Sequence, residues 1–184
     1  MKTIDIRLTD NETKVLRSLI GKKFESFLYD SFNIVNSSSQ AAQINIEGSV
    51  YYIYSFTEPL DYFGKIDDVS VWTWESERYP VVDKKRFSEQ PVQKIINNII
   101  LVQENRRLYK GKEQLYDFWH TRAIIFDFGK YQLSFEKLIW YSEDILFQGG
   151  RDPADHLAKI DDFVHSDWDK GLKAKCSREK VYLA

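Results

Sequence analysis

The sequence has few of the residues that mark disulfide-bonded, zinc-binding or membrane-inserted proteins. Its 184 residues include one cysteine, Cys176, which excludes an intrachain disulfide and any paired-cysteine zinc or redox motif. No apolar stretch approaches the roughly 18 residues that a transmembrane helix needs. The first residues, MKTID, lack the apolar run that follows the lysine of a secretory signal. These absences predict a cytoplasmic protein with no membrane partner.

Proline and glycine are also scarce, with 4 and 8 residues respectively, so we expect no long linkers. The length suits a single domain over residues 1–184, which can bury roughly 70% of its unfolded surface without a metal or a disulfide. Aromatic residues make up 15% of the chain, enough for a substantial core. The formal net charge of −2 makes a nucleic-acid partner unlikely on composition alone. The C-terminal tail, 172–184, is basic, with Lys173, Lys175, Arg178 and Lys180.

Recognised catalytic motifs are missing too. Residues Asp127–Gly129 spell the DFG metal-binding signature of protein kinases, but no glycine-rich phosphate loop occurs anywhere in the chain. The nearest relative of the kinase catalytic loop, His120–Arg122, lacks the aspartate and lies too close to DFG. The nucleophile-elbow pattern GxSxG is absent as well. We therefore lean towards a protein that is not an enzyme.

The DFG segment is better explained as a β-hairpin. In FDFGKYQLSFE, residues 126–136, a two-residue type II′ turn at Gly129-Lys130 segregates the apolar side chains on one face. The expected pairs on that face are Phe128–Tyr131, Phe126–Leu133 and Ile124–Phe135. Phe126 and Leu133 should then be buried, and Asp127 should be exposed and bind no metal.

Other patterns predict the remaining elements. A capping box starting at Thr9 predicts a helix over 10–20. Gly48-Ser49 predicts a hairpin turn that pairs Glu47 with Val50, and alternation predicts a strand over 69–75. Residues 92–103 fit a helix or a strand, and their β-branched side chains favour the strand.

The C-terminal half looks less regular, apart from a second helix. Residues 104–120 are charged and polar and indicate a long loop or a short helix. Asp152 as N-cap, Pro153 after it and Gly171 at the end predict a helix between them, followed by a short strand at 181–183. The fold class we expect is α+β: a mainly antiparallel, twisted sheet of about five to seven strands packed with an N-terminal and a C-terminal helix.

Metal and acid–base sites find little support. The histidines are His120, His156 and His165, and ligands at Asp161, His165 and Asp169 would span about 12 Å along one helix face. We therefore predict no metal ligand and no cofactor. Adjacent acids at Asp67-Asp68, Glu75/Glu77 and Glu143-Asp144 leave open an enzyme whose carboxylates meet only in the fold.

Aromatic residues beside acids are the most distinctive feature, and such clusters suit protein interfaces. The candidate binding residues are Trp72, Trp74, Glu75, Glu77, Trp140, Tyr141, Glu143 and Asp144. We accordingly predict a non-enzymatic protein-binding module, a small bacterial accessory or inhibitor protein of the immunity type that acts by occluding a partner protein. A second alternative is a nucleic-acid binder that uses the basic and aromatic segment 106–112 and the basic tail.

Overall fold

The computed structural model describes residues 1–30, 38–39, 41–75, 87–137, 145–151, 157, 164 and 171–184. Over these residues the chain forms twelve β-strands and one α-helix with defined ends. The α+β prediction is therefore wrong, because the fold is mostly β. No described helix is long and apolar enough to cross a membrane.

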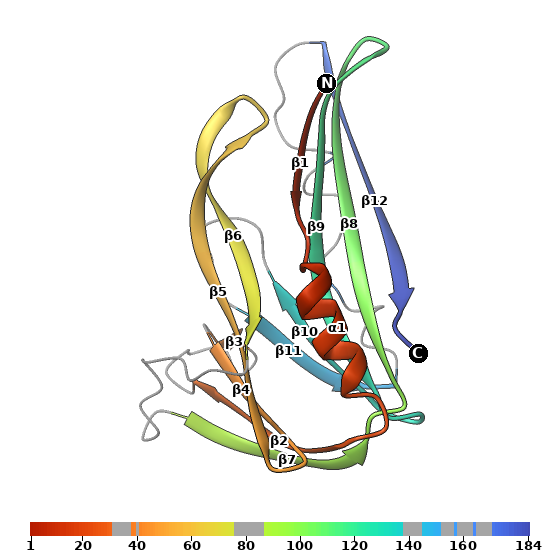
Figure 1. The fold of residues 1–184 in the computed structure, drawn as a ribbon. Helices are drawn as coiled ribbons and strands as arrows, with labels where there is room; N and C mark the ends of the chain where they lie inside the picture. The colour runs from red at the N-terminus through yellow and green to blue at the C-terminus, as the bar shows by residue number, and fades with distance from the viewer. Residues whose placement is uncertain are drawn as a thin grey trace.

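The strands form two sheets (Figure 1). The first sheet has the order β12-β8-β9-β10-β11-β3, with β1 added in parallel to β9. Its strands are β12 (Leu172–Tyr182), β8 (Asn98–Lys110), β9 (Glu113–Asp127), β10 (Gln132–Lys137), β11 (Ile145–Gly150), β3 (Ser38–Ser39) and β1 (Lys2–Ile6). The second has the order β6-β5-β4-β2-β7, formed by β6 (Lys65–Glu75), β5 (Ser49–Tyr62), β4 (Ala41–Ile46), β2 (Lys23–Asp30) and β7 (Phe87–Ile95).

The main core lies where the two sheets face each other. Phe24 of β2 packs edge-on against Phe126 of β9, with ring centroids 5.0 Å apart, and Phe27 packs edge-on against Phe135 of β10 at 5.5 Å. All four side chains are at most 4% exposed. Burial of such large apolar side chains, each worth roughly 1.5–3 kcal/mol, holds the sheets together.

Helix α1 (Asp10–Ser18) connects β1 to β2 and lies over part of β8 and β9 (Figure 1). The predicted capping box is present: Thr9 accepts a hydrogen bond from the Glu12 backbone N–H, and the Glu12 side chain accepts one from the Thr9 N–H. Leu16 buries its side chain in the core, as does Leu19 just after the helix. The same helix brings Asp10 to the exposed side of the first sheet, which matters for the site below.

The hairpin between β9 and β10 has the predicted register. Leu133 pairs with Phe126 and Phe135 with Ile124, and Gly129 takes the positive φ of +90° that the turn requires. Phe126 and Leu133 are buried as expected. Asp127 is half-buried rather than exposed, and its Oδ1 accepts the Gly129 N–H at 2.9 Å.

The hairpin between β4 and β5 turns one residue earlier than predicted. Glu47 and Gly48 both have positive φ values, 47° and 72°, which is the pattern of a type I′ turn. Val50 therefore pairs with Asn45 instead of Glu47. Because the pairing moves by two residues, the same side chains stay on each face, and Ile44 and Ile53 are buried as the alternation requires.

Several segments form longer strands than the sequence predicted. Residues 92–103 are extended, as favoured, but they belong to two strands that meet at Ile96-Asn97. Residues 104–120 are not a loop or helix, because β8 and β9 form a hairpin through a turn at Gly111. The 172–184 tail is largely strand β12, and the predicted helix 152–171 falls almost entirely outside the described residues. Pattern reasoning failed here because charged side chains on β8 and β9 are buried in ion pairs.

The turn at Gly129 supplies a stability test. Replacing Gly129 by Ala should destabilise the fold by about 1–2 kcal/mol, because an L-residue at φ +90° is strained and its Cβ would meet Asn97 Nδ2 at 3.0 Å. Urea unfolding measures the effect. The same change at Gly150, where a Cβ meets nothing within 4 Å, should alter stability by less than about 0.5 kcal/mol. Equal losses at both sites would contradict the turn assignment.

Candidate functional site

Strands β12, β8 and β9 have two different faces, because side chains alternate along a strand. Cross-strand pairing places Glu104 beside His120 and Arg178, on the face that is buried. The neighbouring pair, Gln103 and Glu179, points to the opposite face. One face holds a buried charge cluster, and the other borders a groove.

The charge cluster is centred on Glu104, whose side chain is 0% exposed. Its Oε1 accepts a hydrogen bond from Arg106 Nε at 2.7 Å and lies 3.1 Å from His120 Nε2. Its Oε2 accepts from Arg178 Nε at 2.5 Å. One carboxylate thus links β8, β9 and β12, and the charge-assisted bonds compensate its loss of water.

The cluster extends to the other sheet. Arg106 donates from Nη1 to the Tyr62 hydroxyl oxygen at 2.8 Å, at the end of β5. The buried Lys137 of β10 donates to the Ser70 carbonyl of β6. Arg122 is the extra residue where the pairing of β8 with β9 shifts, and such a bulge re-aims its side chain towards Glu136, which accepts from Nε at 2.7 Å. Buried polar bonds therefore join both sheets.

Burial and charge displace the pKa values of these groups. Burial raises the pKa of a carboxyl group, but the hydrogen bond from His120 and the charges of Arg106 and Arg122 lower the pKa of Glu104 overall, so Glu104 is ionised. Burial lowers the pKa of His120 to about 3, against the opposing effect of Glu104. His120 is neutral at pH 7 and donates from Nε2 to the carboxylate.

Two further groups are shifted in ways that limit their chemistry. Burial, then the charges of Arg122 and Arg106, lower the pKa of Lys137 to about 7. Burial and the charge of Glu104 raise the pKa of the Cys176 thiol to about 11, which makes it a poor nucleophile. Because Glu104 and His120 are 0% exposed, a substrate cannot reach this pair in the present conformation. The cluster therefore acts as a structural network.

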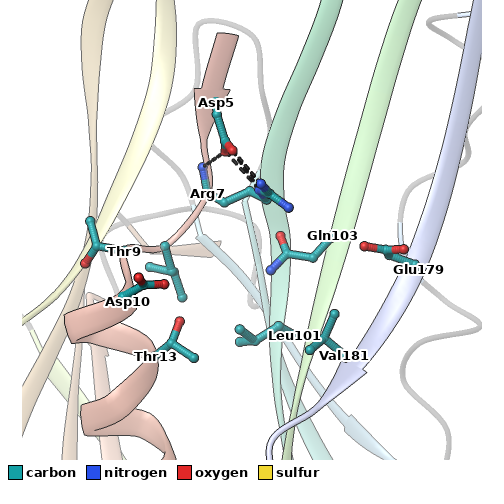
Figure 2. A pocket seen from close by; sticks show the side chains of 10 residues that line it. Asp5, Arg7, Thr9, Asp10, Thr13, Leu101, Gln103, Glu179 and Val181 are labelled. Carbon is teal, nitrogen blue, oxygen red and sulfur yellow. Dashed lines mark hydrogen bonds and ion pairs between the residues drawn. The ribbon is translucent and has the colours of Figure 1, made fainter. Parts of the chain in front are cut away.

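The groove lies on the other face, between α1 and the strands β8 and β12, and has a volume of about 550 Å³. Figure 2 shows the side chains of β1 and α1 across the space from those of β8 and β12. Its lining is mainly polar, with an apolar floor. The lining residues are Asp5, Arg7, Leu8, Thr9, Asp10, Thr13, Leu101, Gln103, Glu179 and Val181.

The groove has an excess of negative charge. Asp5 is held by Arg7, whose Nε lies 2.9 Å from Asp5 Oδ1, and the pKa of Asp5 is lowered chiefly by that bond. Asp10 and Glu179 make no hydrogen bond or ion pair with the described residues. Three acids and one base give the lining a net charge of −2.

Gln103 presents its amide nitrogen to the groove, and the residue as a whole is only 7% exposed. The Thr121 hydroxyl accepts the Leu8 N–H at 3.0 Å and donates to Gln103 Oε1 at 3.0 Å. In this orientation of the amide, Oε1 faces the Thr121 hydroxyl. The Nε2 group is turned towards the groove (Figure 2) and has no hydrogen-bond partner among the described residues.

Aromatic side chains lie under cations further along this face. Arg7 stacks over the Trp119 ring at 4.9 Å from its centroid, and Lys175 stacks over Tyr109 at 5.0 Å. Trp119 and Tyr109 are half-buried. We call the outward side chains of β12, which are Lys173, Lys175, Ser177, Glu179 and Val181, together with Arg107, Tyr109 and Trp119, the open face.

The three sequence-predicted binding residues that the structure describes lie on β6 and not on this face. Trp74 is 4% exposed and packs on Tyr51 and Phe126 in the core. Trp72 and Glu75 share strand β6 with it and pair through their backbones with Ser55 and Tyr52. The other five candidates lie outside the described residues: Glu77, Trp140, Tyr141, Glu143 and Asp144.

The carboxylate and metal candidates give a similar result. Of the adjacent acids, Asp67-Asp68 lies on β6 with Asp68 exposed, while Glu77, Glu143 and Asp144 are not described. Among the described residues, no three His, Cys, Asp or Glu side chains are grouped as a metal site requires. His120 is a hydrogen-bond donor to Glu104, and His156 and His165 lie outside the described residues.

Sequence reasoning missed the groove because its walls come from three separate segments, 5–13, 101–103 and 179–181. Asp10 was recognised only as helix-capping charge, and Glu179 only as part of a basic tail. Had 101–107 and 175–181 been identified as strands, alternation would have grouped Gln103 with Arg107 and Lys175 with Glu179.

Comparisons with known proteins found no match: no protein-family model, no curated protein and no solved structure matches the chain.

The ionised state of Glu104 predicts a large loss of stability on neutralisation. Glu104→Gln should lower the free energy of unfolding by about 3–5 kcal/mol, because Arg106 and Arg178 would lose the carboxylate that accepts their hydrogen bonds in the interior. Denaturant titration measures it. Glu113→Gln, the same change at an exposed turn position, should cost less than about 0.5 kcal/mol. A loss below about 1 kcal/mol for Glu104→Gln would show that the carboxylate is not the centre of the network.

Lys137 predicts an unusual pH dependence. Its pKa is about 7 in the folded protein and near 10.4 when unfolded, so between pH 7 and 8.5 the unfolded chain binds the extra proton. Stability contributed by Lys137 therefore rises with pH in this window, by about 1 kcal/mol per pH unit. Unfolding of wild type and Lys137→Met at several pH values tests this: the variant should lose the rise, and exposed Lys130→Met should keep it. Parallel wild-type and Lys137→Met profiles would contradict the shift.

Proposed function

We propose that this protein is a non-enzymatic binding module that occludes a partner protein through the open face and the groove beside it. The observation that carries the proposal is the contrast between the two faces of β8, β9 and β12. The inner face compensates its charges internally around Glu104. The outer face carries Glu179, across the groove from Asp10 of α1, and neither carboxylate makes a hydrogen bond or an ion pair among the described residues.

The composition of the open face supports a protein partner. Trp119 and Tyr109 combine large apolar area with a polar group, and both signs of charge surround them. Buried aromatic anchors with a charged rim are typical of protein interfaces. The idea inferred from sequence, aromatic anchors beside acids, is thus retained with different residues.

The mode of action follows from what the site can do chemically. The titratable pair with the most strongly shifted pKa values, Glu104 and His120, is enclosed, and the described groove residues include no histidine, lysine, cysteine or serine beside the accessible acids. Binding alone is the simplest use of such a surface, and an inhibitor of the immunity type acts by covering a partner.

A nucleic-acid partner is the second candidate, and one observation favours it. The two basic segments 106–112 and 172–184 lie on neighbouring strands, with Arg107 paired to Lys175 and Tyr109 to Lys173. Basic residues beside an aromatic ring suit single-stranded nucleic acid. Glu179 on the same face opposes a polyanion, so we rank this function second.

Capture from the native host tests the first candidate. Tagged wild-type protein should retain one host protein in a stoichiometric amount, and Glu179→Lys should retain at least tenfold less, because reversal places a cation where the partner docks. Glu58→Lys, the same change at an exposed site on β5, should capture as wild type does. Binding must then be reproduced with the purified partner. Equal capture by both variants, or salt-sensitive retention of RNA or DNA alone, would contradict the proposal.

A further inference from the structure

We propose that the groove receives an arginine or lysine side chain from an extended segment of the partner, whose main-chain carbonyl accepts a hydrogen bond from Gln103 Nε2. This inference rests on the proposed function and names the chemistry that the partner brings to the site. It is carried by two independent features of the groove, one that selects a cation and one that selects a hydrogen-bond acceptor.

The cation is selected by Asp10 and Glu179. They come from α1 and β12, on opposite sides of the groove (Figure 2), and neither makes a hydrogen bond or an ion pair among the described residues. Arg7, the only cation among the described lining residues, is held by Asp5, stacks on Trp119 and interacts with the charge of Glu179. A positive helix N-terminus offsets part of the charge of Asp10, but it cannot reach Glu179, so an unmatched negative charge remains.

The acceptor is selected by Gln103. Its Oε1 is occupied by the Thr121 hydroxyl, which leaves two N–H donors of Nε2 at the floor of the groove. The residue is only 7% exposed, and its Nε2 is not among the buried atoms that lack a partner, because it opens onto the groove. A ligand with a carbonyl oxygen would replace water at these donors, whereas a simple metal ion or amine would not.

A peptide is the ligand class that offers both groups together. Its main-chain carbonyl suits Gln103, and the charged end of a long basic side chain on the same segment suits the acids. The apolar floor formed by Leu101 and Val181 fits the methylene stem that a long basic side chain buries. Arginine should bind more tightly than lysine, because its planar fork of donors can hold two carboxylates at once.

Titration of the full-length protein with short capped peptides tests this chemistry. Acetyl-Ala-Ala-Arg-Ala-Ala-amide should bind with a Kd on the order of 1 mM, measured by the shifts of the Gln103 side-chain NH₂ and the Asp10 and Glu179 amide signals in ¹⁵N spectra. The same peptide with citrulline, which keeps the shape and loses the charge, should bind at least fivefold more weakly. Spermidine, which lacks a carbonyl, should leave the Gln103 NH₂ signal unmoved.

Matched variants separate the groove from the rest of the surface. Glu179→Gln and Asp10→Asn should each weaken the arginine peptide severalfold, while Glu113→Gln, at the distant turn, should not. Equal binding of the citrulline and arginine peptides would overturn the inference, and so would spermidine binding as tightly as the peptide. If host capture depends on Glu179 but no peptide binds, this inference fails and the proposed function stands. If the peptide binds and no host protein is captured, the chemistry inferred for the groove stands and the proposed function fails.

Discussion

The buried carboxylate of Glu104 is the interaction on which much of this fold depends. It lies between β8, β9 and β12 and accepts hydrogen bonds from Arg106 and Arg178, with His120 as the third neighbour. Each of these groups would be costly to bury alone. Together they allow three long polar strands to form one sheet face in the interior, and the bond from Arg106 to Tyr62 continues the network to the second sheet.

The two faces of these strands therefore have different roles. Charges on the inner face are matched within the chain, so they stabilise the sheet and offer nothing to a ligand. Charges on the outer face are less closely matched: Arg7 binds Asp5 and also interacts with the charge of Glu179, while Asp10 makes no ion pair among the described residues. The strands that need an internal ion cluster to fold are therefore also the strands that carry the accessible charge.

The parts of the fold that were predictable depend on local chemistry. The β9–β10 hairpin follows from Gly129 at the turn and from the alternation of Phe126 and Leu133 around it. The capping box at Thr9 is equally local. Strands β8 and β12 could not be predicted in the same way, because hydrophobic patterns treat Glu104 and Arg178 as surface residues. Their burial depends on partners 16 to 74 positions away in the chain.

The site was harder to foresee than the fold, for a related reason. Trp74 is aromatic and stands beside an acid in the sequence, yet its ring serves the core. Gln103 carries no such signal, and it becomes informative only because Thr121 occupies its oxygen and leaves its nitrogen facing the groove. A residue type alone therefore does not distinguish a structural polar group from a binding one. The distinction is whether the chain itself satisfies the group, and in the described residues it satisfies Glu104 fully and leaves the amide of Gln103 open.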